Sequence, residues 1–328
     1  MLRPFPSLSA NTVASGGFAY VQSMEIDPLG RMWVLDSGSQ NQAGGEFILG
    51  PPRVVLLDLT QSPPQVLVDY TFPVPVARAG NMTFLNDIVV DWRNDWAYIS
   101  DTFADGGILF FDAQQLVSRR MTNQFTGAEL QYLTRDFCGE KTITLGASPS
   151  DGIALSPDAS TLYFCPLTGH SLYAIPTASL RDLSKSQQQL ASDVTLLGQK
   201  LGMSDGLAMT SDGTLIYGSL ESCALLSWDA AAQQPLTSSP SSQRALLQNR
   251  TIYNWADTFA FDGRGSLLFT TNRLAYFFAG EMAFDGSTGS NFRIFTFNLG
   301  VESYMSFASH SHVSLLFVLL TFCFEFIL

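Results

Sequence analysis

The sequence has few charged residues, and basic residues are the scarcer kind. Its 328 residues include 17 Lys and Arg against 29 Asp and Glu, a formal net charge of −12. Charged residues make up 14% of the chain, against roughly 25% in typical soluble domains. A protein that neutralises phosphates needs a basic face, so this balance argues against nucleic acid as a partner.

Cysteine is also scarce, and several catalytic motifs are missing. The four cysteines, Cys138, Cys165, Cys223 and Cys323, are far apart and form no Cys-x-x-Cys pair, which excludes a zinc ribbon and a thioredoxin-like motif. One disulfide is possible, and the sequence leaves its pairing open. There is no Gly-x-Ser-x-Gly elbow, no P-loop and no dinucleotide-binding glycine motif, so the corresponding enzyme classes lack their signatures.

The two ends of the sequence differ in apolar character. The first residues contain no long apolar run, so they do not read as a secretory signal. Residues 313–328 are almost continuously apolar but include Glu325, and they are too short to span a bilayer core comfortably. We therefore expect 306–328 to be a tail outside the folded domain, without a membrane anchor. Sequons at Asn81 and Asn249 are candidate glycosylation sites if the protein is secreted.

The chain does contain an internal repeat. Five segments share a polar start, a short apolar strand, a turn rich in Asp, Pro, Gly or Asn, and a second apolar strand: 21–38, 86–101, 151–166, 205–220 and 257–272. Further strand-like segments follow them at 54–59, 107–112, 170–175, 224–229 and 291–297. Antiparallel strands that recur about every 50–65 residues are typical of a β-propeller, so we predict an all-β fold with five visible blades.

The repeat aligns one polar residue at the start of each first strand. These residues are Gln22, Asn86, Asp151, Asp205 and Asp257. The innermost strands of a propeller line its axis, so the five side chains should converge at one mouth of the channel. Their side-chain oxygens could cap the strands by accepting hydrogen bonds from backbone amides of the turns. Alternatively, converging carboxylates could bind an organic cation, or Ca²⁺ held by Asn86, Asp151 and Asp205.

Several separated motifs, in order, resemble the major royal jelly and yellow protein family. They are the stretch Leu2–Pro6 with Met32–Gly38, then Asp151–Pro157, Trp255–Asp262, Thr271–Leu274 and Asn291–Ile294. The resemblance covers about residues 1–305, which we predict to be one propeller domain. It implies a six-bladed, secreted propeller, with an N-terminal region of about one blade before the first of these motifs. We therefore expect about five of six blades, with the N-terminal blade missing.

The resemblance also implies a function. Some relatives bind small molecules such as biogenic amines in the axial channel, and the last-blade match places Thr258 and Asn272 in that pocket. Phe84, Phe259 and Tyr276 could add cation–π contacts. We expect an extracellular protein that binds a small molecule of the biogenic-amine or catechol kind. The expected ligand-binding residues are Asn86, Asp151, Asp205, Asp257, Thr258 and Asn272.

The alternative is an enzyme. Some yellow relatives are associated with dopachrome conversion, a tautomerisation that needs a general base, and Asp151 or Asp205 could serve. The segments Ser150-Asp151-Gly152 and Ser204-Asp205-Gly206 also resemble calcium-dependent lactonase propellers of the gluconolactonase and regucalcin kind, in which an axial metal activates water.

Overall fold

The structure is a computed structural model. It describes residues 3–42, 45–48, 50–77, 83–139, 141–232, 235–237, 242–287 and 289–306. The predicted tail at 307–328 and the sequon residue Asn81 lie outside the described residues.

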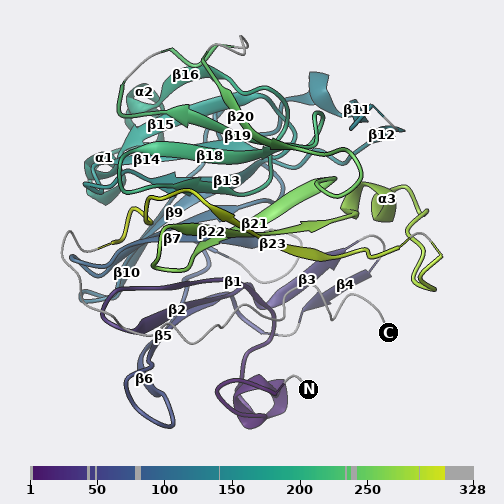
Figure 1. Cartoon of the computed structure of the whole chain (residues 1–328). Helices are drawn as coiled ribbons and strands as arrows, with labels where there is room; N and C mark the ends of the chain where they lie inside the picture. The colour runs from purple at the N-terminus through teal and green to yellow at the C-terminus, as the bar shows by residue number, and fades with distance from the viewer. Residues whose placement is uncertain are drawn as a thin grey trace.

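Five antiparallel sheets follow one another along the chain and are arranged as the blades of a propeller (Figure 1). Blade 1 contains β1 (Val21–Ile26), β2 (Arg31–Asp36), β5 (Arg53–Asp58) and β6 (Gln65–Thr71). Blade 2 contains β7 (Leu85–Asp91), β8 (Trp96–Asp101), β9 (Gly107–Asp112) and β10 (Val117–Met121). Blade 3 contains β13 (Ser150–Leu155), β14 (Thr161–Pro166), β15 (Ser171–Pro176) and β16 (Thr195–Gln199). Blade 4 contains β17 (Leu207–Met209), β18 (Thr214–Ser219), β19 (Ala224–Asp229) and β20 (Arg244–Gln248). Blade 5 contains β21 (Trp255–Phe261), β22 (Ser266–Asn272) and β23 (Arg293–Asn298).

The blades pack face to face through large apolar side chains. One continuous core contains the fully buried Trp33 of blade 1, Tyr98 of blade 2, Phe164 of blade 3 and Tyr217 of blade 4. The first strand of each blade contacts the first strand of the next, so β1, β7, β13, β17 and β21 line the axis. The predicted all-β propeller and its five visible blades are confirmed.

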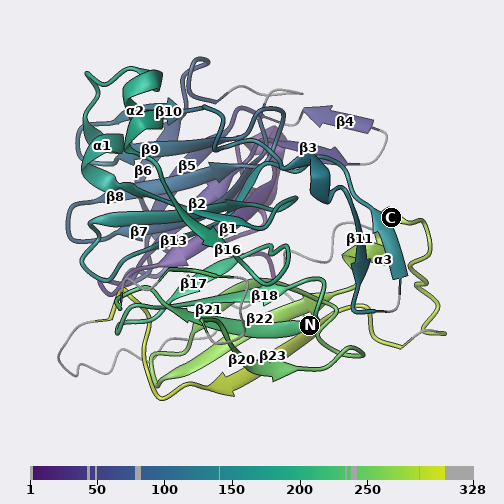
Figure 2. The same cartoon turned by 90° about the horizontal axis from the view of Figure 1, so that it is seen from above.

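Two small hairpins and several short helices connect the blades. The hairpins are β3–β4 (Ser39–Gln42, Gly45–Ile48) and β11–β12 (Thr134–Phe137, Lys141–Thr144). The α-helices are α1 (Thr177–Arg181), α2 (Gln187–Asp193) and α3 (Leu274–Phe278), and the 3-10 turns are η1 (Ser9–Asn11), η2 (Val13–Ser15) and η3 (Leu130–Tyr132). Figures 1 and 2 both place the two hairpins and α3 at one end of the molecule, and α1 and α2 at the other. We call the first the hairpin end.

After β23 the chain forms a strap, residues 299–306, that joins two blades which are not neighbours. Ser303 bridges to Thr210 of blade 4, and the Tyr304 amide donates to the Met209 carbonyl at 3.0 Å. The Tyr304 hydroxyl meanwhile bonds the backbone of Val90 in blade 2, accepting from its amide at 3.0 Å. Because blade 3 separates blades 2 and 4, the strap holds together sheets that do not hydrogen-bond to one another.

Tyr304→Phe is expected to lower the free energy of unfolding by about 1–3 kcal/mol, because it leaves the buried Val90 amide without its acceptor. Urea denaturation would measure the loss. Tyr70→Phe is the matched control, since its hydroxyl pairs with Ser118 in the partly exposed outer strands, and it should cost less. An equal, small loss in both variants would mean that the strap does not stabilise the ring.

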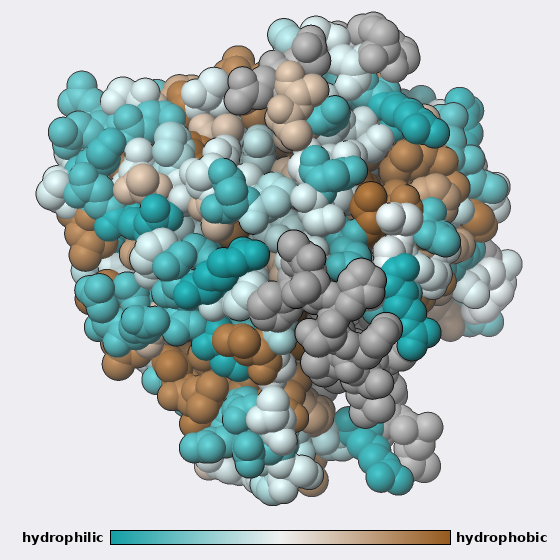
Figure 3. Space-filling view, turned by 60° about the vertical axis from the view of Figure 1, so that its left-hand side comes forward, coloured by the Kyte–Doolittle hydropathy of each residue, from teal (hydrophilic) through white to brown (hydrophobic). Residues whose placement is uncertain are grey.

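The surface in Figure 3 carries hydrophilic residues with groups of apolar residues among them, and one of these groups lies low on the molecule, where Figure 1 has blade 1. Exposed apolar residues of this part of the chain include Leu8, Val13, Leu29, Val66 and Leu67. Blade 1 therefore leaves more apolar surface to solvent than a fully enclosed blade would.

Candidate functional site

The polar residues aligned by the repeat lie at a β-bulge, which is repeated in the inner strands. The register with the second strand shifts between Leu85 and Ile88, between Ser150 and Ile153, and between Ala256 and Phe259. A similar shift falls between Val21 and Ser23 of β1. A bulge bends the strand and re-aims its side chains. Here it places the aligned residue in the irregular part of the strand in blades 1, 2, 3 and 5, whereas Asp205 of blade 4 lies just before β17.

Hydrogen bonds join the aligned residues of four blades in sequence. Gln22 Nε2 donates to Asn86 Oδ1 at 2.8 Å, and Asn86 Nδ2 donates to Asp151 Oδ1 at 2.6 Å. The carboxyl groups of Asp151 and Asp205 then hydrogen-bond to each other. Two carboxyl groups can do so only if one carries a proton. The structure thus brings together Asn86, Asp151 and Asp205, with the last two paired side chain to side chain.

Asp257 sits beside that chain with its own partners. Asn272 Nδ2 donates to Asp257 Oδ2 at 2.6 Å, and Thr258 Oγ1 donates to Asp257 Oδ1 at 3.1 Å. Asn272 is buried, whereas Thr258 is exposed. The charge of Asp257 acts on both Asp151 and Asp205. Thr258 and Asn272, the residues carried over from the family resemblance, therefore contact one aligned carboxylate, that of Asp257.

A further carboxylate, Asp87, was missed by the sequence analysis. It accepts from the Ser23 hydroxyl at 3.2 Å and from the Ile88 amide at 2.9 Å, and it interacts with the charge of Asp257. The repeat places glycine, serine or threonine at the equivalent positions, so an acid one residue after Asn86 carried no repeated signal. We call Asp87, Asp151, Asp205 and Asp257 the axial cluster.

Burial and mutual repulsion disfavour the charged forms of these groups. Burial raises the pKa of Asp87 to about 7. Burial also raises the pKa of Asp205 well above its ordinary value, and the charges of Asp151 and Asp257 raise it further. The pKa values of Asp151 and Asp257 are raised as well, chiefly by burial. The axial cluster is therefore poised to exchange protons, or to gain a cation, near neutral pH.

Basic side chains do not neutralise the cluster among the residues that the structure describes. The ion pairs found there involve other carboxylates, such as Asp36, Asp101 and Glu221. Lys200 is buried nearby in sequence, but its Nζ donates to the Ser204 hydroxyl at 2.8 Å. The carboxyl groups of the axial cluster therefore have no ion-pair partner among the described residues.

Other aspartates perform the capping that the repeat also allowed. Asp27 Oδ1 accepts from the Leu29 and Arg31 amides, and Asp262 Oδ1 accepts from two turn amides of blade 5. Asp151, Asp205 and Asp257 receive hydrogen bonds from side chains instead. The axial carboxylates thus differ in kind from the turn caps.

The described residues offer little to a metal ion. No group of three or more His, Cys, Asp and Glu side chains within them is arranged to hold one. Of the proposed calcium ligands, Asp205 already accepts from the Trp255 indole at 2.6 Å, and Asp151 accepts from Asn86. Ca²⁺ takes six to eight oxygen ligands. The arrangement therefore does not fit the calcium site that the sequence analysis considered.

The candidate aromatic residues have different surroundings. Phe84, two residues before Asn86, lies with its ring centroid 6.0 Å from that of Tyr20, two residues before Gln22. Phe259 instead packs on Phe269 in the core between blades 4 and 5. The Tyr276 ring lies 4.4 Å from the Arg273 guanidinium. Phe84 is thus the candidate whose ring contacts an aromatic residue of the neighbouring blade.

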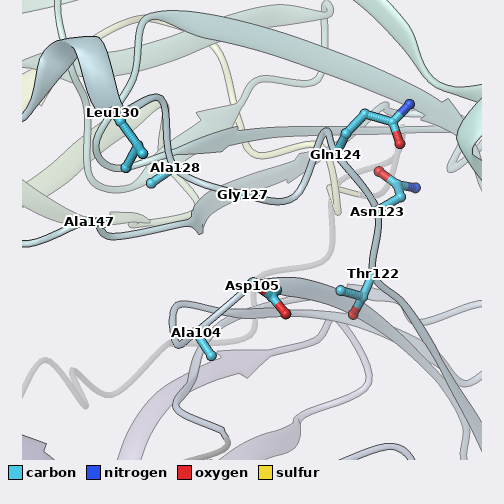
Figure 4. A pocket seen from close by; sticks show the side chains of 9 residues that line it. All are labelled: Ala104, Asp105, Thr122, Asn123, Gln124, Gly127, Ala128, Leu130 and Ala147. Carbon is cyan, nitrogen blue, oxygen red and sulfur yellow. The ribbon is translucent and has the colours of Figure 1, made fainter.

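A surface hollow of about 490 Å³ lies apart from the axial residues (Figure 4). Its lining comes from the turn after β8 and from the segments before and after β11–β12, and includes Asp105, Thr122, Asn123 and Gln124. None of the axial cluster lines it. The hollow is open, its lining is polar and apolar in about equal parts, and it carries no acidic group other than Asp105.

Comparison with known proteins assigns the family. The model of the family described as "Major royal jelly protein" matches residues 20–302. The chain belongs to the major royal jelly protein family. Major royal jelly protein 6 of Apis mellifera is 28% identical over 244 residues, which cover 72% of this chain and 53% of that protein. Major royal jelly protein 3 of Apis mellifera is 30% identical over 182 residues, 54% of this chain and 32% of that protein. The chain spans about half or less of the length of these relatives.

Solved structures resemble this family member more distantly. A putative TolB from Agrobacterium tumefaciens aligns with a TM-score of 0.49 and 14% identity, covering 87% of this chain and 83% of that one. A gluconolactonase from Xanthomonas campestris aligns with a TM-score of 0.46 and 15% identity, covering 76% and 69%. The propeller assignment rests on the five sheets themselves.

Proposed function

We propose that this royal jelly family protein binds a small organic cation, an amine with an apolar body, at the axial cluster. The observation that carries the proposal is the set of four converging acidic side chains without a basic partner among the described residues. An ammonium group would neutralise negative charge there and donate N–H hydrogen bonds to the carboxylate oxygens.

Two aromatic side chains that precede aligned residues would suit the rest of such a ligand. Tyr20 and Phe84 come from neighbouring blades and precede the hydrogen-bonded pair Gln22 and Asn86. Rings near an ammonium group add cation–π attraction, and they also cover an apolar or aromatic body. An aromatic amine of the dopamine or serotonin kind combines both features.

We also propose that the protein acts outside the cell. Cys138 and Cys223 form a disulfide, a bond that persists in oxidising compartments. Asn249 and Thr251 of the second sequon are both exposed, so the site is open to glycosylation. The helices within the described ranges are all too short or too polar to cross a membrane.

Calorimetric titration with dopamine and serotonin tests the binding. Wild-type protein is expected to bind at least one of them. The single variants Asp151→Asn and Asp205→Asn are each expected to weaken binding at least about tenfold, because asparagine keeps the shape of the side chain but removes its negative charge. Circular dichroism would check that the fold is kept. Asp262→Asn removes a carboxylate from a turn and should leave the affinity unchanged.

A neutral analogue separates charge recognition from simple apolar binding. Catechol lacks the ammonium group of dopamine and should bind much more weakly. Equal binding of both compounds, or no binding of either amine by well-folded protein, would contradict the proposal.

A second candidate function is proton transfer on a catechol-like substrate. The specific observation in its favour is the side-chain contact between Asp151 and Asp205, since two paired carboxyl groups with raised pKa values can accept one proton and donate another. Dopachrome decay followed by absorbance would test it. Acceleration that disappears in Asp151→Asn would support catalysis, whereas a rate equal to the uncatalysed one would leave binding as the function.

A further inference from the structure

The β11–β12 hairpin stands outside the five blades, yet it is fixed to two of them. A two-stranded hairpin is at best marginally stable on its own. This one is tied to blade 4 by the Cys138–Cys223 disulfide, and the Cys138 amide donates to the Glu221 carbonyl at 3.0 Å. Lys141 also pairs with Glu281, which follows α3. The hairpin therefore reaches across the hairpin end of the ring (Figures 1 and 2).

One hairpin side chain is connected to the axial cluster through a single intermediary. The Phe137 ring stacks on the Trp255 ring, with centroids 5.9 Å apart and planes 8° from parallel. Both side chains are buried, Phe137 with 3% and Trp255 with no exposure. Trp255 Nε1 in turn donates to Asp205 Oδ2 at 2.6 Å. The hairpin thus covers the indole that holds an axial carboxyl group in place.

The apolar surroundings show that this contact closes the hairpin end near Asp205. Phe137 and Trp255 belong to a cluster separate from the main core, together with Ile143, Met203 and Leu220. Met203 lies two residues before Asp205, just as Trp255 lies two residues before Asp257. The hairpin therefore packs on the residues that lead directly into two of the axial positions.

We propose that β11–β12 is the lid of the axial site and that Phe137 is a positioning residue, which acts on Asp205 through Trp255. The ligand part of this inference rests on the proposed function, whereas the lid itself does not. Loss of the Phe137 ring would uncover one face of Trp255 and admit water beside its hydrogen bond to Asp205. A competing water weakens a buried hydrogen bond and lets the carboxyl group change its orientation.

The experiment compares Phe137→Ala with two matched variants of the full chain. Phe137→Ala is expected to weaken dopamine binding about tenfold, chiefly through faster dissociation, and to make Trp255 accessible to acrylamide quenching. Phe137→Tyr keeps the ring and should restore both properties. Asp136→Asn changes an exposed neighbour on the same hairpin and should alter neither. Trp255→Phe identifies the share of the fluorescence that comes from Trp255.

Two outcomes would contradict the proposal that the hairpin is a lid, and both can be measured without a ligand. Unchanged quenching of Trp255 in Phe137→Ala would show that the hairpin does not cover it. Unchanged hydrogen exchange at 134–139 and 141–144 after removing the disulfide, by Cys138→Ala with Cys223→Ala, would show that the bond does not hold the hairpin. If wild-type protein binds no amine but Trp255 and the hairpin respond as expected, the proposed function fails and the lid stands.

Discussion

Replacing Gly152 with alanine is expected to lower the free energy of unfolding by about 3 kcal/mol, because the added methyl group has no room. A Cβ atom there would lie 2.2 Å from the carbonyl oxygen of Asp205 and 2.9 Å from Leu207 Cγ. The first of these neighbours is backbone and cannot turn away. Blade 4 would have to move relative to blade 3, and Asp205 would move with it.

Urea denaturation and dopamine titration would measure both consequences in the same protein. Gly146→Ala is the matched control, since a Cβ at that position meets nothing within 4 Å. It should leave stability and affinity close to those of the wild type. If Gly152→Ala were as stable as Gly146→Ala, the close approach of the two inner strands would not be a constraint on the fold.

The same contact explains a motif that the sequence analysis connected with lactonases. Ser150-Asp151-Gly152 and Ser204-Asp205-Gly206 share a glycine after the axial aspartate. A Cβ at Gly206 would lie 2.2 Å from the Asp257 carbonyl oxygen, the equivalent atom of the next blade. The glycine is therefore required by blade packing at this position, whatever chemistry the aspartate performs.

The inner parts of the blades were predictable because they are largely apolar and repeat regularly. Each begins with two apolar strands around a tight turn, and this pattern is visible in five places. The outer strands were not predicted. β10, for example, reads Val-Ser-Arg-Arg-Met and is only partly buried, so its composition carries little strand signal. The strap and the hairpins depend on contacts between distant residues, which a local pattern does not contain.

The candidate site divides in the same way. Alignment of the repeat predicted that Asn86, Asp151 and Asp205 would lie together, and they do. It did not reveal Asp87, Trp255 or Phe137, because each acts through a contact specific to one blade or one hairpin. Pairing of Cys138 with Cys223, 85 residues apart, was likewise open until the fold brought them together.

The axial cluster makes the folded protein less stable at high pH than at low pH. Burial raises the pKa of Asp87 from 3.8 to about 7 on folding. Between these two values the folded chain keeps a proton that the unfolded chain has released, so the free energy of unfolding falls as pH rises and the loss is complete above about pH 7. Because Asp87 is partly exposed and solvent screens it, its contribution to this loss of unfolding free energy is on the order of 3 kcal/mol. The raised pKa values of Asp151, Asp205 and Asp257 add to it.

Urea denaturation at pH 5 and pH 8 is therefore expected to show a clearly less stable protein at pH 8. Asp87→Asn keeps an acceptor for Ser23 and cannot ionise, so it should stabilise the protein at pH 8 and shrink the difference. Asp158→Asn removes the same charge from an exposed turn, where hydrogen bonds from Ser156 and Ser160 lower the pKa of Asp158, and it should leave the difference unchanged.

An amine that neutralises the cluster should raise stability more at pH 8 than at pH 5. If Asp87→Asn instead destabilised the protein at pH 8, its carboxylate would already be compensated by a cation, and the axial cluster would not be an open acidic site.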